Sequence, residues 1–266
     1  MQSLSSSSSL IHHKSKKTSD GTLLEGKILY KQYQEGYRTA LEPILMAAAI
    51  PAKAGQTIIE GGCGAGAGLM CLHHRVPNIS GIGFEQHPEM IALANENFQL
   101  NEMNSLKAIE ITLPKLPKRP FDFLPQGQEH VDHVFSNPPW HSYNSCPSPD
   151  PKKDLAKRLP KGFLSEWIYA LSRPLRQGGT LTLALSVSLY AEASAVMHHY
   201  KLGSLILFPL WPKVNRPPRI ILLQGRMGST GGSHIAPGLV LHEDNGNFTT
   251  EANHILKDGK MLCLLP

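Results

Sequence analysis

The chain has 266 residues, of which 41% are hydrophobic and 18% are charged. This composition excludes a disordered protein, and it predicts no membrane span, because the longest apolar stretch, residues 41–51, is about half as long as a bilayer core requires. The formal net charge of +5 favours a polyanionic partner.

Residues 1–20 are rich in serine and then basic, and they lack the apolar core of a signal peptide. We expect them to form a disordered tail. One domain is predicted over residues 21–226, and residues 227–266 are predicted to be a linker and a short C-terminal extension. The linker is the Gly/Ser-rich segment 228–233.

Helical and strand patterns alternate along the predicted domain. The predicted helices cover residues 42–49, 68–75, 88–101, 163–175 and 191–200. The predicted strands cover residues 56–60, 79–85, 106–113, 131–136, 180–188, 202–208 and 219–224. This order predicts an α/β fold with a doubly wound, seven-stranded, mostly parallel sheet, and the last two strands predict an antiparallel C-terminal hairpin.

The four cysteines form no CxxC pair, and the 13 histidines are scattered along the chain. We therefore expect neither a disulfide framework nor a metal site, and cysteine usage of this kind fits a cytoplasmic protein.

A glycine-rich turn follows the first predicted strand of the sheet. Gly62, Gly64 and Gly66 alternate, which allows a sharp turn and a close approach of the backbone to a ligand. Such a turn also fits a nicotinamide or flavin enzyme. Glu60 argues against that interpretation, because the same position is usually apolar in dinucleotide-binding folds. Glu85 ends the next strand, where a carboxylate can accept hydrogen bonds from both ribose hydroxyls in either kind of enzyme.

A second motif, Asn137-Pro138-Pro139-Trp140, follows the strand at 131–136. Each of the first two residues precedes a proline and is held extended, so the loop is stiff. The side-chain oxygen of Asn137 and the carbonyl of Pro138 can each accept one hydrogen of a substrate NH2, and Trp140 offers a flat face for a base. A simple strand-terminating turn is the structural alternative.

Together these segments resemble the class I S-adenosylmethionine-dependent methyltransferases that carry an Asn-Pro-Pro-aromatic motif. Within this group, the chain is similar to the bacterial tRNA (adenine-N6) methyltransferases that act on valine tRNA beside the anticodon. The residues that carry the resemblance are 36–38, Glu42, 60–66, Glu85, Asn95, Asn97, Asn101 and 137–140. Glu42 stands where aspartate is expected, and Trp140 where tyrosine is commoner.

The resemblance implies roles for individual residues. Asn137, Pro138 and Trp140 would be catalytic. The residues implied to bind S-adenosylmethionine are Tyr37, Arg38, Glu60, Gly62, Gly64, Gly66 and Glu85. The expected product is N6-methyladenosine in RNA, with tRNA as the partner. The basic segment 151–161, together with Lys213, Arg216 and Arg219, could contact phosphates.

Other functions remain open at the level of sequence. Other enzymes with the same motif methylate guanine amines in ribosomal RNA or glutamine amides in release factors. The glutamine methyltransferases usually carry an N-terminal helical domain, which is not apparent before Gly36. A non-catalytic cofactor-binding partner protein would be expected to lack Asn137. An NAD-dependent reductase would not require Glu60 or the motif at 137–140.

Overall fold

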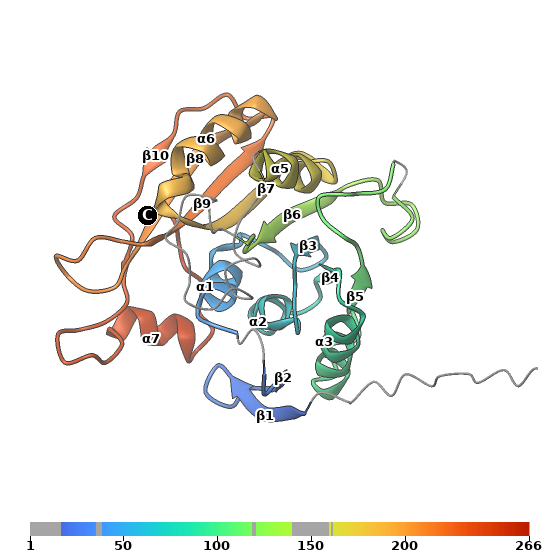
Figure 1. The fold of residues 1–266 in the computed structure, drawn as a ribbon, viewed down its shortest axis with the longest axis horizontal. Helices are drawn as coiled ribbons and strands as arrows, with labels where there is room; N and C mark the ends of the chain where they lie inside the picture. Colours follow the sequence, from blue (N-terminus) through green and yellow to red (C-terminus); the bar gives the residue numbers. More distant parts are fainter. Residues whose placement is uncertain (1–16, 36–38, 119–120, 140–159, 161, 266) are drawn as a thin grey trace, which may run out of the picture.

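The computed structural model describes residues 17–35, 39–118, 121–139, 160 and 162–265. At its centre lies a sheet whose strands follow the order β10-β8-β9-β7-β6-β3-β4-β5, with β11 also paired to β8 (Figure 1). The strands of its main part are β3 (Thr57–Gly61), β4 (Ser80–Glu85), β5 (Leu106–Glu110), β6 (Val131–Ser136), β7 (Leu175–Ser186), β8 (Leu202–Trp211) and β9 (Ile220–Met227).

The strands β3 to β7 are parallel to one another, whereas β9 runs antiparallel to both β7 and β8. The predicted α/β fold with an antiparallel C-terminal hairpin is therefore confirmed. The predicted seven strands are extended by β10 (His234–Ile235) and β11 (Leu239–Val240), which both pair in parallel with the outer edge of β8.

Helices cover both faces of the sheet, so its interior strands are apolar on both sides. Figure 1 shows α5 (Phe163–Ser172) and α6 (Tyr190–His199) on one side, and α1 (Glu42–Ala49), α2 (Ala67–Arg75) and α3 (Pro88–Leu100) on the other. A short 3-10 helix, η1 (Val187–Leu189), leads into α6. Neighbouring β6 residues separate accordingly: Phe135 belongs to the core under α1 and α2, and Val134 to the core under α5 and α6.

The N-terminal segment corrects the prediction of a disordered tail through residue 20. Residues from Thr18 onward form β1 (Thr18–Leu23), which pairs antiparallel with β2 (Ile28–Tyr33). Two asparagine side chains bond the free edge of β2: Asn97 in α3 and Asn101 at its C-cap each accept one backbone N–H of β2 and donate to one of its carbonyls. These contacts span 66 to 72 residues, so a local pattern does not reveal them.

Other boundaries differ by a few residues. The predicted helix 163–175 ends at Ser172, and β7 begins at Leu175, five residues before the predicted strand, because Pro174 stops the helix. The predicted C-terminal extension contains α7 (Thr250–Leu256), whose first turn is capped by the Thr249 side chain accepting from the Ala252 N–H. In the described part of the chain, no helix is long and apolar enough to cross a bilayer.

Candidate functional site

The candidate site lies where the carboxyl ends of β3, β4 and β6 meet. β3 is flanked by the other two strands, with Gly61 in register with Phe84 of β4 and with Ser136 of β6. The glycine turn and the Asn-Pro-Pro motif, 71 residues apart from Gly66 to Asn137, are thus brought to adjacent strand ends. In open α/β sheets, ligands bind outside this edge.

The glycine turn has the backbone conformation that its composition predicts. Gly62, Gly64 and Gly66 have φ angles of 72°, 54° and 86°, a region that L side chains rarely adopt. At Gly66, a Cβ atom would also lie 2.5 Å from the ring of Phe98. Gly66 is the N-cap of α2, so the turn delivers the N-terminus of this helix to the site.

Glu60 is a buried carboxyl group at the end of β3. Its Oε2 accepts a hydrogen bond from the backbone N–H of Leu69 at 3.0 Å, and a Cβ on Gly68 would collide with the carboxyl group. Burial raises the pKa of Glu60 to about 8, with a further contribution from the charge of Glu85, while the hydrogen bond from Leu69 opposes the rise. A cationic group of a ligand beside Glu60 would lower this pKa and stabilise the ionised carboxylate.

Glu85 is held at the end of β4 by three backbone N–H groups. Gly64 donates to Oε2 at 3.1 Å, and Gln86 and His87 donate to Oε1 at 2.8 and 3.0 Å. These bonds fix the carboxylate against the glycine turn before any ligand arrives. A carboxylate offers about four lone-pair positions, so it retains capacity to accept from a hydroxyl group.

Asn137 and Pro138 follow β6 directly. Pro138 is buried, whereas Asn137 is half-buried and Pro139 exposed. The preceding residue, Ser136, is fully buried; its hydroxyl donates to the carbonyl of Gly61 at 2.7 Å and accepts from Nε1 of Trp167 at 3.1 Å. This chain of hydrogen bonds ties the base of the Asn-Pro-Pro motif to β3 and α5.

Trp167 is the residue of this region that sequence reasoning missed. Its ring lies against the glycine turn, since a Cβ on Gly62 would be 3.9 Å from it. The available signal was a tryptophan within an apolar helix, because a buried indole N–H requires an acceptor. Ser136, which immediately precedes the motif, provides this acceptor.

The structure thus brings together seven of the residues predicted for the site: Glu60, Gly62, Gly64, Gly66, Glu85, Asn137 and Pro138. Tyr37, Arg38, Trp140 and nearly all of the basic segment 151–161 lie outside the described residues. Lys213, Arg216 and Arg219 lie in the connection between β8 and β9, at the same edge of the sheet. Lys213 donates to the Asp244 carbonyl at 3.0 Å, and the other two are exposed.

Metal-binding and thiol groups were also considered among the residues that the structure describes. No group of three or more His, Cys, Asp or Glu side chains in them could hold a metal ion. Cys63 lies within the glycine turn, but it is buried, and burial raises the pKa of its thiol well above the usual value. A thiol in this state is a poor nucleophile.

Comparison with models of known protein families finds a match to part of the chain. Residues 43–151 match the family model of the methyltransferase small domain, and this range includes the glycine turn, Glu85 and the Asn-Pro-Pro motif. No curated protein matches the chain in sequence.

Solved structures share the fold at low sequence identity. A predicted O-methyltransferase from Agrobacterium tumefaciens has a TM-score of 0.66 at 23% identity, over 82% of this chain and 96% of its own. A type I restriction-modification methyltransferase subunit from Streptococcus thermophilus has a TM-score of 0.55 at 19% identity, over 82% of this chain and 51% of its own. TYW2 from P. horikoshii, in complex with MeSAdo, has a TM-score of 0.53 at 12% identity, over 81% and 73%.

The family match and the methyltransferase fold support an enzyme of the S-adenosylmethionine-dependent methyltransferase class, with S-adenosylmethionine as its cofactor. The likeness to solved structures concerns the fold, so the acceptor of the methyl group has to be argued from the site itself.

Proposed function

We propose that this chain transfers a methyl group from S-adenosylmethionine to the exocyclic amine of an adenine in RNA, with an anticodon-loop adenine of tRNA as the acceptor. The observation that carries the proposal is the position of Asn137 and Pro138. They follow β6, whose last residue, Ser136, is hydrogen-bonded to Gly61 at the end of β3. The glycine turn follows β3 directly.

The residues at the edge of the sheet fit the cofactor. Burial raises the pKa of the Glu60 carboxyl group, and a cationic ligand group beside it would favour its charged form. Gly62, Gly64 and Gly66 would let the cofactor approach the backbone, and Glu85 would accept hydrogen bonds from its ribose hydroxyls. When bound, the cofactor supplies an electrophilic methyl group on a sulfonium centre.

The acceptor would be held by the Asn-Pro-Pro motif. The Asn137 side-chain oxygen and the Pro138 carbonyl would each accept one N–H of the adenine amine, so that the nitrogen lone pair faces the methyl group. As the N–C bond forms, the bond between the methyl carbon and sulfur would break, and its electron pair would stay on sulfur to leave a neutral thioether. The nitrogen would then be cationic and would lose a proton to water. Because the proton leaves after the methyl group arrives, this mechanism requires no general base.

Charge favours RNA over protein as the acceptor. The chain carries a formal net charge of +5, and the exposed side chains of Arg216 and Arg219 lie at the same edge of the sheet as the motif. Bases in an anticodon loop are unpaired, so little energy is needed to turn one into a pocket. Trp140, by its place in the sequence, would provide a stacking face for this base.

The experiment is methyl transfer from labelled S-adenosylmethionine into separate tRNA, ribosomal RNA, DNA and protein fractions from cells that lack the gene. We expect label in tRNA, recovered as N6-methyladenosine. Label in the protein fraction, recovered as methylglutamine, would support the second candidate function, which uses the same motif. Binding of the cofactor without label in any fraction would contradict both.

A further inference from the structure

An open pocket of about 410 Å³ lies at the opposite edge of the sheet from the candidate site. It is formed where β6, β7 and β8 begin and β9 ends. Its lining includes Tyr169, Arg173, Leu175, Tyr200, Lys201 and Met227. Since β6 has six residues, the two edges are separated by roughly 20 Å.

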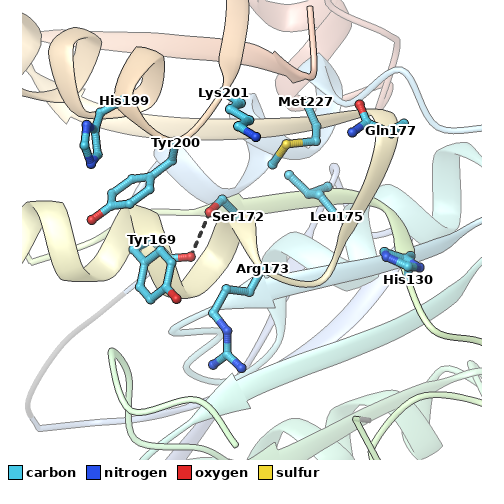
Figure 2. A pocket seen from close by; sticks show the side chains of 10 residues that line it. All are labelled: His130, Tyr169, Ser172, Arg173, Leu175, Gln177, His199, Tyr200, Lys201 and Met227. Atoms are coloured by element: carbon cyan, nitrogen blue, oxygen red, sulfur yellow. Dashed lines mark hydrogen bonds between the residues drawn. The ribbon is translucent and has the colours of Figure 1, made fainter. Parts of the chain in front are cut away.

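Aromatic rings form one wall of this pocket. Tyr169 at the end of α5 is 48% exposed, and its ring centroid lies 4.9 Å from that of Tyr200, which follows α6. His199 meets the Tyr200 ring edge to face at 4.8 Å. Figure 2 shows these three rings gathered on one side of the pocket, with Leu175 and Met227 beyond them. A flat, partly exposed aromatic surface of this kind suits the stacking of a planar ring.

The charges around the pocket are positive. Arg173 and Lys201 contribute to the lining, and none of the ten lining residues is acidic. Arg173 is held in place, since it donates to the Leu116 carbonyl at 3.3 Å and its guanidinium lies 5.3 Å from the Phe121 ring centroid. Lys201 is exposed in the turn between α6 and β8. The nearby carboxylate of Asp132 forms an ion pair with Arg176 at 2.7 Å.

We propose that this pocket binds a single-stranded segment of nucleic acid, with a base stacked on Tyr169 and Tyr200 and with phosphates beside Lys201 on one side of the pocket and Arg173 on the other (Figure 2). The proposal rests on the proposed function and adds to it a second contact with the substrate RNA. A polynucleotide can reach from one edge of the sheet to the other, so the pocket would increase affinity without taking part in methyl transfer. The aromatic wall favours a nucleic acid over an acidic peptide, which would use the positive charges alone.

The test compares the full-length double variant Tyr169→Ala/Lys201→Ala with the wild type. Both side chains are exposed, so their removal should leave the melting temperature and cofactor binding unchanged. A matched control, Lys53→Ala/Met261→Ala, removes one exposed lysine and one exposed apolar side chain elsewhere. The probes are a fluorescein-labelled single-stranded RNA of mixed sequence, in an anisotropy titration, and bulk tRNA, in the methyl-transfer assay.

We expect the pocket variant to bind the RNA about tenfold more weakly than the wild type and the control, with a similar rise in KM for tRNA and an unchanged kcat. A photo-crosslink from 4-thiouridine-containing RNA should map to the peptides that contain Tyr169 or Tyr200. Affinity within twofold of the control, or a crosslink that avoids both peptides, would overturn the proposal.

The two proposals fail in different ways. If the wild type methylates tRNA and the pocket variant has the same KM, the pocket proposal fails and the proposed function stands. If the wild type neither binds nor methylates RNA, both fail. An acidic peptide that binds through Tyr169 and Lys201, when the RNA probe does not, would assign the pocket to a protein partner and overturn the proposal.

Discussion

At the scale of single residues, the two carboxyl groups that we propose for the cofactor half of the site lie in different environments. Glu60 is buried with one backbone donor, whereas Glu85 receives three. Burial favours the protonated form of Glu60 and raises its pKa, whereas the three N–H donors fix the position of the Glu85 side chain. The contrast suggests separate tasks, with Glu60 facing a positive group and Glu85 accepting from hydroxyls.

Cofactor binding should depend on pH through Glu60. Its pKa is raised from 4.5 to about 8 in the ligand-free fold, so at pH 7 binding of a cation requires a proton to leave. Affinity for S-adenosylmethionine should therefore rise as pH increases from about 6 to about 8 and level off above. Calorimetry at pH 7 in buffers of different ionisation enthalpy should detect the released proton.

The control for this prediction is Glu60→Gln, which should remove the proton release together with the pH dependence.

The raised pKa of Glu60 also affects the stability of the fold, with a defined sign. The folded state retains a proton that the unfolded state loses above pH 4.5, so Glu60 lowers the free energy of unfolding of the ligand-free protein as pH rises toward 8. An affinity for S-adenosylmethionine that stays constant between about pH 6 and about pH 8 would contradict the role given to Glu60.

Glu85→Ala should weaken cofactor binding by about tenfold to a hundredfold, because hydrogen bonds to a charged group contribute roughly 1.5–3 kcal/mol. Titration calorimetry at pH 8 would measure it. The affinity of the Glu85→Gln variant for the cofactor should lie between those of the wild type and the alanine variant, since an amide retains one acceptor oxygen. Unchanged affinity in the alanine variant would exclude Glu85 from the cofactor site.

At the scale of elements, the hydrogen bonds from Trp167 through Ser136 to Gly61 connect α5, β6 and β3 beneath the Asn-Pro-Pro motif. Trp167→Phe should reduce the free energy of unfolding by about 1 kcal/mol beyond the loss of ring volume, because the Ser136 hydroxyl loses its donor. A double-mutant cycle with Ser136→Ala, followed by urea unfolding, isolates this coupling. Strictly additive effects would show that the bond contributes nothing.

The first half of β6 contains a buried histidine that makes the stability of the fold depend on pH. His133 in β6 is buried and hydrogen-bonded to Thr180 at 2.8 Å and to Gln56 at 3.1 Å, and burial lowers its pKa from 6.5 to about 4. The unfolded state therefore takes up a proton between these values that the folded state does not. Stability should fall as pH decreases from 6.5 to 4, by up to about 3 kcal/mol.

Urea unfolding at pH 7 and at pH 4.5 measures this loss, and His133→Gln provides the comparison. The variant should be less stable at pH 7 but should lose less on acidification. An equal loss in both proteins would assign the acid sensitivity to the carboxylates instead of to His133.

Sequence patterns predicted the main elements well where their cause was local. The strand at β3, the glycine turn and α2 follow from an apolar run and three glycines with positive φ. The hairpin of β1 and β2 was not predicted, because its free edge is paired by Asn97 and Asn101 from a distant helix. Trp167 was missed for the same reason, since its partner Ser136 lies 31 residues away.

At the scale of the whole molecule, the two edges of the sheet differ in composition. The carboxyl edge presents Glu60, Glu85, the glycine turn and the Asn-Pro-Pro motif, whereas the amino edge presents aromatic and positive side chains around an open pocket. One sheet would thus separate methyl transfer from additional RNA contact. This arrangement follows from the parallel direction of β3 to β7, which brings the carboxyl ends of these five strands to one edge.

The most direct test of the central claim is nucleoside mass spectrometry of tRNA, taken from cells that lack the gene, after incubation with deuterated-methyl S-adenosylmethionine and either the wild type or Asn137→Ala. The wild type should produce labelled N6-methyladenosine. The variant should lose about a hundredfold or more of this activity while binding the cofactor with unchanged affinity. Equal N6-methyladenosine from both proteins would contradict the role of Asn137, and the absence of labelled N6-methyladenosine with the wild type would contradict adenine in tRNA as the acceptor.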